Sequence, residues 1–244
     1  MIPAPVGMTA TKWLGPAAVS IAAALLLAVL WEPAAGRGLV GSGAAYTIMT
    51  YDQVLPLLGL GIALANMSRW RTVVAAVLFI GGIPAGILGE ARLVSAMTAA
   101  PGLHPLFVFI GPLCCVIIGL ALGSPAALRA WTVPVAAALS GAALGFLIAL
   151  HDPAPGDGRF SGGAAAAGLW LVAAPAVLLR PAAGSWLTIG SRVFASWLIA
   201  IGLLLGGSSY VVKQRAERAA AVERTMPKDR LAPPHRPAVT GAPL

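Results

Sequence analysis

Long apolar runs constrain the fold of this 244-residue chain more than any other feature. A backbone in hydrocarbon must satisfy its own hydrogen bonds, so runs of this length predict membrane-spanning helices. Charged residues make up only 10% of the chain, against about 25% in a typical soluble domain. The sequence therefore predicts an all-α polytopic transmembrane bundle of six to seven helices. The runs are Leu14–Trp31, Tyr46–Met67, Thr72–Gly89, Pro105–Gly123, Thr132–Leu150, Gly163–Leu179 and Trp186–Val212.

The chain divides into three predicted segments. Residues 1–31 form an N-terminal helix, for which an uncleaved span is favoured over a signal peptide because Glu32 and Pro33 make a poor cleavage site. Residues 32–212 form the bundle, and Glu32–Ala45 reads as a Gly-rich loop. Residues 213–244 form a basic, Pro-rich tail, with a short amphipathic helix predicted over Lys213–Arg224 and disorder over the last twenty or so residues.

The net charge of +8 does not indicate nucleic-acid binding, because of where the charges lie. Seven of the 16 basic residues follow residue 212, and most of the others stand singly between apolar runs. This distribution is typical of a multi-pass protein in a bacterial-type inner membrane, with the lipid bilayer as its main partner. The positive-inside rule, applied to the short loops, places one group of basic residues in the cytoplasm. With seven spans, the basic tail would then lie outside. That group comprises Lys12, Arg69, Arg71, Arg129, Arg180 and Arg192.

Asp52 is the main candidate functional residue. It stands about two turns into the run Tyr46–Met67, with little polar company apart from Gln53 and with Pro56 four positions on. Burying an ionisable group in a membrane helix is costly, so such a group is a functional-site hypothesis by default. The alternative is that Asp52 reaches interfacial water and only influences topology. Met49 and Tyr51 flank it and either line its site or face lipid.

Two further residues are candidates for ion binding or transport. Glu90 closes the run Thr72–Gly89 and faces either a pore or the lipid headgroups. His151, followed by Asp152 and Asp157, either gathers a cation at a channel mouth or belongs to a polar turn. Asp52 and His151 are the candidate ligands for a transported divalent metal ion, and no resident cofactor is expected.

Small residues at helical spacing favour close helix packing. Gly82 and Gly86 form one such pair, with Pro84 between them, and Gly141 and Gly145 form a second. The segment around Ser140 has the same character. Cys114 and Cys115 predict no disulfide and read as two small buried hydrophobic residues rather than soft metal ligands.

Catalytic motifs do not stand out in the sequence. There is no H-E-x-x-H pattern, and Ser140 and His151 are not placed as a nucleophile–base pair. The chain is predicted not to be an enzyme.

The order of features resembles the HupE/UreJ family, small polytopic membrane proteins associated with nickel supply to hydrogenase and urease. The family's motif, histidine-proline-x-x-glycine-x-aspartate-histidine, falls on Tyr46–Gln53. A later His-rich stretch is similar to LHDPAPGDG, which contains His151. GLGIALA after Asp52 and SRVFASWLIAIGLLLGG in the last run complete the likeness, which covers about residues 40–212.

The resemblance implies a nickel permease, but the family's imidazoles are missing. Only Asp52 survives from the first motif, and Tyr46 and Gln53 stand where histidines are expected. Nickel prefers nitrogen and sulfur donors. Asp52 with His151 or Glu90 would therefore favour a harder or transient ion, or a proton. A second hypothesis remains: a non-transporting scaffold that binds a membrane protein partner through small-residue helix faces and the basic tail.

Overall fold

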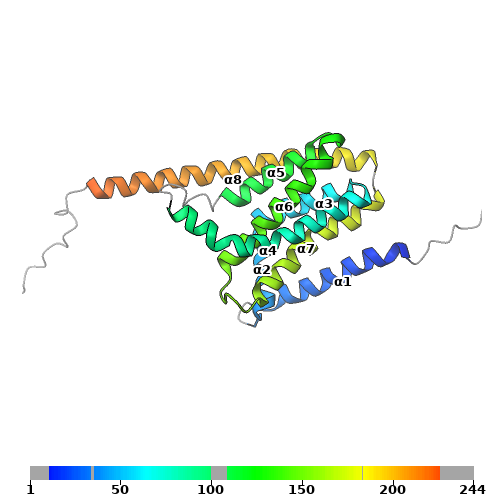
Figure 1. Cartoon of the computed structure of the whole chain (residues 1–244), viewed down its shortest axis with the longest axis horizontal. Helices are drawn as coiled ribbons and strands as arrows, with labels where there is room; N and C mark the ends of the chain where they lie inside the picture. Colours follow the sequence, from blue (N-terminus) through cyan, green and yellow to red (C-terminus); the bar gives the residue numbers. More distant parts are fainter. Residues whose placement is uncertain (1–10, 34–35, 100–108, 183, 226–244) are drawn as a thin grey trace, which may run out of the picture. The chain divides into compact units, whose positions relative to one another are not determined.

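The computed structural model describes residues 11–33, 36–99, 109–182 and 184–225, and every regular element among them is a helix (Figure 1). The all-α prediction is therefore confirmed for this part of the chain. The α-helices are α1 (Thr11–Trp31), α2 (Leu39–Met49), α3 (Tyr51–Ala65), α4 (Arg69–Ala99), α5 (Ile110–Gly123), α6 (Ala126–His151), α7 (Arg159–Leu179) and α8 (Ser185–Thr225), and a 3-10 helix, η2, covers Arg180–Ala182.

Four helices in the described residues are long and apolar enough to cross a membrane. The pair α2 and α3, bent by 79°, makes a fifth crossing if the two helices count as one span. The described residues thus do not confirm the predicted number of six to seven spans. In α1 the residues whose side chains the structure describes include a shorter apolar stretch, Ala17–Ala28, and residues 105–108 of the fourth predicted run lie outside the described residues. The four spans are Arg69–Ala96, Ala126–His151, Arg159–Leu179 and Trp186–Val212.

Residues 1–206 and 207–244 form two separate units. In the second unit, the helix predicted over Lys213–Arg224 is present, but it is the end of α8 rather than a separate element. Within it the side-chain amide of Gln214 donates to the hydroxyl of Tyr210 at 2.9 Å. The disorder predicted for the last residues concerns 226–244, which lie outside the described part of the chain.

Two predicted boundaries are wrong. The segment Glu32–Ala45 is not entirely a loop, because α2 begins at Leu39. Its glycines do not break this helix because Gly43 lies directly against the backbone of α7 at Phe160. The third run does not end near Gly89 either: α4 continues to Ala99, so Glu90 lies within a helix rather than at its end.

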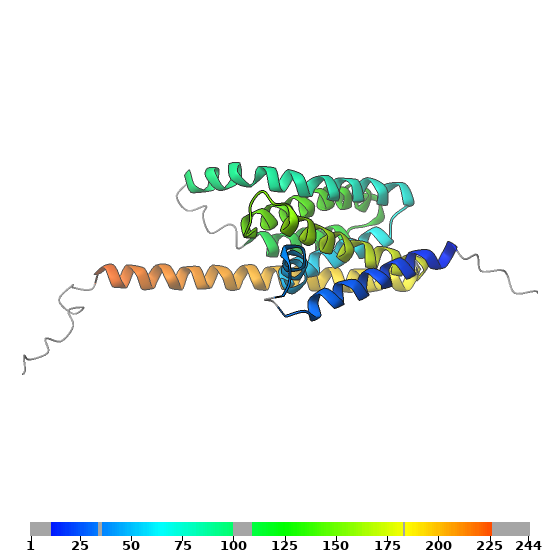
Figure 2. The ribbon, with the colours of Figure 1, turned by 90° about the horizontal axis from the view of Figure 1, so that it is seen from below.

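Helices α4 and α6 are in extensive contact, and they lie side by side in both ribbon views (Figures 1 and 2). A Cβ atom on Gly86 would collide with the carbonyl oxygen of Ala142, and one on Gly145 with that of Ile83. A Cβ atom on Gly141 would collide with the carbonyl oxygen of Phe79, and one on Gly82 would lie 2.6 Å from that of Ala138. The prediction that these glycine pairs permit close helix approach is confirmed, and the two pairs pack against each other.

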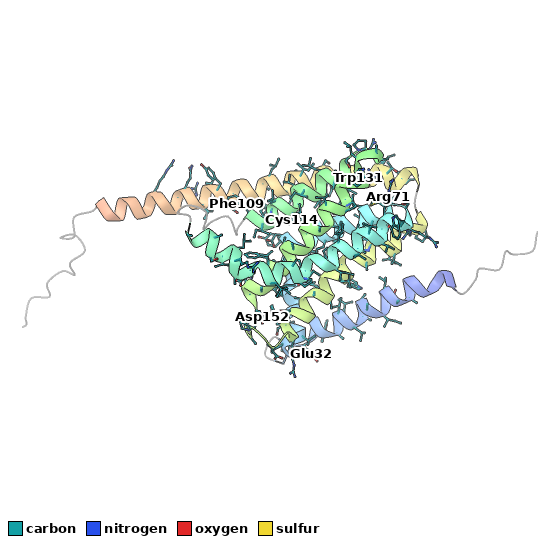
Figure 3. All side chains as sticks on the ribbon, in the orientation of Figure 1. Glu32, Arg71, Phe109, Cys114, Trp131 and Asp152 are labelled. Atoms are coloured by element: carbon teal, nitrogen blue, oxygen red, sulfur yellow. The ribbon has the colours of Figure 1, made fainter. Side chains whose placement is uncertain are left out.

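Helices α4 and α6 also run in the same direction. Phe79 meets Gly141 and Ile83 meets Gly145, so the contacts advance together along both helices. Arg71 and Trp131, near the two N-termini, lie at one end of the bundle, and Asp152 lies at the other (Figure 3). The chain between them must therefore return to the first end. Helix α5 makes part of that return, since its 14 residues span about 21 Å of a hydrocarbon core about 30 Å thick.

Helix α3 lies at the centre of the first unit. It contacts α2, α4, α5, α6 and α7. Leu57, Leu60 and Leu64 on this helix are almost completely buried. The element that carries Asp52 is thus enclosed by protein on most sides, unlike α4, which exposes Val73, Val77 and Ile80 along one face.

Candidate functional site

Asp52 lies in the first turn of α3, directly after a sharp break in the helix. Thr50 separates α2 from α3 with φ −90° and ψ 92°, an extended conformation. Its backbone amide bonds to the carbonyl of Tyr46 at 3.2 Å, and its hydroxyl bonds to the same carbonyl. The prediction of an unbroken helix through Tyr46–Met67 is therefore wrong. A break of this kind at membrane depth is tolerated where the backbone is enclosed by protein or lines a cavity.

Pro56 explains why the backbone carbonyl of Asp52 is not used inside the helix. A carbonyl in an α-helix normally accepts from the amide four residues later, and proline has no amide hydrogen. The thiol of Cys115 on α5 lies 4.0 Å from the Asp52 carbonyl oxygen and supplies a weak donor in place of that amide. Helices α3 and α5 are thereby joined at the site.

The Asp52 side chain fits against Gly111 at the start of α5. A Cβ atom on Gly111 would collide with the carboxylate oxygen Oδ2 and would lie only 2.9 Å from the Cβ and Cγ atoms of Asp52. Any larger residue at position 111 would displace the carboxylate. The absence of a side chain on Gly111 therefore sets the position of the Asp52 carboxylate.

A small cavity lies beside Asp52, between α3, α5 and α6. Its volume is about 20 Å³, enough for about one water molecule. Asp52 is the only acidic residue among its lining residues, and Cys114, which Figure 3 labels on α5, contributes a thiol. The lining residues are Asp52, Gln53, Pro56, Leu57, Gly111, Cys114, Ser140, Ala143, Leu144 and Leu147.

Two polar side chains that line this cavity each have one buried atom without a hydrogen-bond partner. Gln53 is 5% exposed and Ser140 is 4% exposed, and neither Gln53 Oε1 nor Ser140 Oγ has a hydrogen-bond partner in the protein. A buried polar atom without a partner costs about 1–3 kcal/mol, so such atoms are rare. In the part of the chain that the structure describes, the only other buried side-chain polar atom without a partner is Arg129 Nε. Two of the residues that line the cavity therefore contain polar atoms that the protein leaves unpaired.

Hydrogen bonds connect the cavity to His151 at the end of α6. The Gln53 Nε2 group donates to the Tyr46 hydroxyl at 3.2 Å, and that hydroxyl lies 3.0 Å from His151 Nδ1. The Tyr46 and His151 rings also pack together, with centroids 4.9 Å apart. His151 is exposed, so the chain of contacts leads from the surface to the cavity. The structure thus links Tyr46, Gln53 and His151 through their side chains, although they lie on α2, α3 and α6.

The other acidic candidates lie apart from this cavity. Glu90 lies on α4 and does not line it. Asp152 accepts hydrogen bonds from the Ala154 amide at 3.0 Å and the Ser161 hydroxyl at 2.8 Å. Asp157 pairs with Arg159 at 3.4 Å. Asp152 and Asp157 thus serve the turn between α6 and α7, as one of the two interpretations of the sequence supposed.

The described residues contain no group of three or more His, Cys, Asp or Glu side chains close enough to hold a metal ion. Sequence reasoning missed Ser140 and Cys114 as neighbours of Asp52, because it interpreted both as packing residues. Nothing in their local sequence distinguishes them, and only the packing of α5 and α6 on α3 brings them to Asp52.

No family model, curated protein or solved structure matches the chain.

Proposed function

We propose that the chain is a permease that moves a small cation across a bacterial-type inner membrane, with Asp52 as the carboxylate that binds the ion. One observation carries the proposal: the acid lies at a break in the central helix pair and lines a cavity with two unpaired polar side chains. Several apolar helices of spanning length accompany it.

The broken helix pair supports a transport role. In many transporters the substrate site is formed near the bilayer midplane by discontinuous helices, whose ends and side chains contact the ion. The α2–α3 pair has this form, with Asp52 immediately after the break and α3 at the centre of the packing. An acid that only influenced topology would need neither the space above Gly111 nor a cavity.

The likeness to HupE/UreJ proteins extends, within this proposal, to the membrane architecture and the position of the acid. Tyr46 and Gln53 offer a phenol and an amide where that family has imidazoles, so the proposed cargo is not tightly bound nickel. His151, hydrogen-bonded to Tyr46, is proposed as a peripheral group that influences entry of the ion.

Reconstitution in liposomes tests the proposal directly. Purified full-length protein is expected to give cation flux above that of empty liposomes for at least one member of a panel of sodium, potassium, manganese, nickel, cobalt and zinc ions and protons. The assay measures accumulated ion by mass spectrometry, and protons by an internal pH dye. Flux equal to that of empty liposomes for every member of the panel would contradict the permease.

A scaffold function remains a second candidate. Helix α8 extends beyond its apolar span to Thr225, and this extension carries basic residues that a partner protein could contact. The small-residue faces of α4 and α6 are less available to a partner than the sequence suggests, because they pack on each other. The tail of residues 213–244 is then the remaining contact for a partner protein.

Deleting residues 213–244 discriminates between these two functions. A permease should keep most of its flux, because the cavity and every residue that lines it lie within residues 1–206. A scaffold should lose its partner when the truncated protein is captured from membranes. Loss of flux on truncation, with the protein still inserted and monodisperse, would count against the proposed location of the transport site.

A further inference from the structure

We propose that Arg129 and Arg192 bind the phosphate group of an anionic phospholipid. The two side chains belong to the first two turns of α6 and α8, and neither lines the cavity beside Asp52. The site therefore adds a ligand to the molecule without depending on the permease function. Four features carry the inference: the packing of α8 on α5, the charge at this end of the bundle, the unused donors of the two guanidinium groups, and the apolar surface around them.

The packing of α8 on α5 brings the two arginines to the same end of the bundle. A Cβ atom on Gly119 of α5 would lie 2.9 Å from the Ala195 carbonyl oxygen. One on Gly202 of α8 would lie 2.7 Å from the Pro112 carbonyl oxygen. The contacts advance in opposite directions along the two helices, so α8 is antiparallel to α5. The start of α8 therefore lies beside the end of α5, and α6 begins three residues after α5 ends.

This end of the bundle is rich in arginine and lacks acids. The residues that form it, 66–72, 124–132, 180–182 and 184–195, contain no aspartate or glutamate. Figure 3 marks this end by Arg71 and Trp131. Its arginines are Arg69, Arg71, Arg129, Arg180 and Arg192. An anion that approaches this end of the bundle therefore meets only positively charged side chains.

Arg129 keeps hydrogen-bond donors that the protein does not use. Its Nη2 group donates to the carbonyls of Leu122 and Ser124, each at 3.0 Å, and these bonds fix the guanidinium at the C-terminal end of α5. Within the described residues, neither Nε nor Nη1 of Arg129 has a hydrogen-bond partner. Nε is buried, whereas Nη1 is not among the fully buried atoms. Nη1 is therefore the donor that a ligand can reach.

Arg192 also has a charge that the protein does not neutralise. Its side chain is exposed, and it forms no ion pair or hydrogen bond with the described residues. The positive charges of Arg192 and Arg129 lie close enough to repel each other. Like charges at short distance are unfavourable, and an anion that contacts both removes this cost. Guanidinium groups bind phosphate oxygens through paired N–H bonds, so a phosphate group suits these two side chains.

Apolar surface around the arginines selects a lipid rather than a soluble phosphate ion. Leu128, Ile189 and Val193 are neighbours of the two arginines in the sequence, and their side chains are exposed. The acyl chains of a bound lipid would cover them. Both arginines also lie within about two turns of the start of an apolar span, from where their long side chains reach the headgroup level. Basic residues at this level attract anionic lipids.

Native mass spectrometry of the purified full-length protein tests the site, because it counts the lipids that each chain retains. The protein is mixed in detergent with phosphatidylglycerol, which is anionic, or with phosphatidylcholine, whose choline group cancels the phosphate charge. Wild type is expected to retain one phosphatidylglycerol per chain, with at least about fivefold higher affinity than for phosphatidylcholine, since each arginine near an anionic headgroup contributes about that factor. Equal affinity for the two lipids would overturn the proposal.

Arg192→Gln removes one of the two charges and should weaken phosphatidylglycerol binding about fivefold. The variant should remain folded, because the Arg192 side chain is exposed and has no partner in the described residues to lose. Arg192→Lys keeps the charge without the planar fork and should lose less affinity. Arg71→Gln removes an exposed arginine from the same end and should stay within about twofold of wild type. Equal losses in Arg192→Gln and Arg71→Gln would show diffuse attraction and overturn the site.

Inorganic phosphate distinguishes a lipid site from a site for a free anion. It offers the same oxygen atoms as the headgroup but has no acyl chains to cover Leu128, Ile189 and Val193. An excess of inorganic phosphate should therefore leave phosphatidylglycerol bound, as should sodium chloride at the same ionic strength. Displacement of the lipid by phosphate but not by chloride would overturn the assignment to a phospholipid.

Discussion

Asp52→Asn should abolish cation flux while the protein still inserts in the membrane and remains folded. Asparagine has nearly the same size as aspartate, so it fills the same space against Gly111, but it carries no charge to hold a cation. Removing one member of a buried charge pair typically costs about 3–5 kcal/mol. We therefore expect ion affinity to fall by at least about 100-fold. Flux into liposomes, at matched protein amount, measures the effect.

Two acidic residues outside the cavity provide controls for this prediction. Glu90→Gln removes the carboxylate of a residue on α4 that does not line the cavity. Asp157→Asn removes the carboxylate of an exposed ion pair. Both variants should keep flux within about twofold of wild type, since exposed pairs contribute about 0–1 kcal/mol. Wild-type flux in Asp52→Asn, or loss of flux in Glu90→Gln alone, would contradict the assignment of the transport carboxylate.

Gly86→Ala should destabilise the protein strongly although it adds only one methyl group. The new Cβ would collide with the carbonyl oxygen of Ala142 and lie 2.8 Å from the amide of Phe146, so α4 and α6 would have to separate. Overpacking of this kind costs about 1–3 kcal/mol, and here the obstacle is backbone rather than a flexible side chain. The melting temperature in detergent is expected to fall by several degrees.

Gly81 and Gly89 in the same helix provide controls for this prediction, because alanine at either position should not lower the melting temperature. A Cβ atom on either of these two glycines would have nothing within 4 Å. Alanine is favoured over glycine in a helix by about 1 kcal/mol. Gly81→Ala and Gly89→Ala should therefore be neutral or stabilising, while Gly86→Ala lowers the melting temperature. Equal melting temperatures for all three variants would show that α4 and α6 do not pack through these glycines in the membrane.

The helical class follows from the apolar runs alone, because a chain with so little charge has few other ways to fold. The break at Thr50 does not follow from them, since the residues on both sides are equally apolar. The first part of α2, Leu39–Ala45, was missed for a related reason: glycines lower helix propensity, and close packing of Gly43 and Gly163 on neighbouring backbone outweighs that cost. Such contacts join segments far apart in the chain, which local patterns do not reveal.

Only part of the candidate site could be predicted from the sequence. Asp52 stands out because a lone acid in an apolar run is expensive, and that argument needs no fold. Ser140 does not stand out, because a serine among glycines and alanines reads as ordinary helix packing. The hydrogen bond between Tyr46 and His151 joins residues separated by 105 positions, and only the tertiary structure brings them together.

The contact between Asp52 and Gly111 has an evolutionary consequence. The two positions cannot vary independently, because the carboxylate occupies the volume that a side chain at position 111 would need. Homologous chains that retain an acid at position 52 should retain glycine at position 111. A chain in which position 111 has acquired a larger residue should carry a smaller residue at position 52 and, with it, a lost or altered cargo. Paired variation at these two positions would then separate ion-binding lineages from those that have abandoned the site.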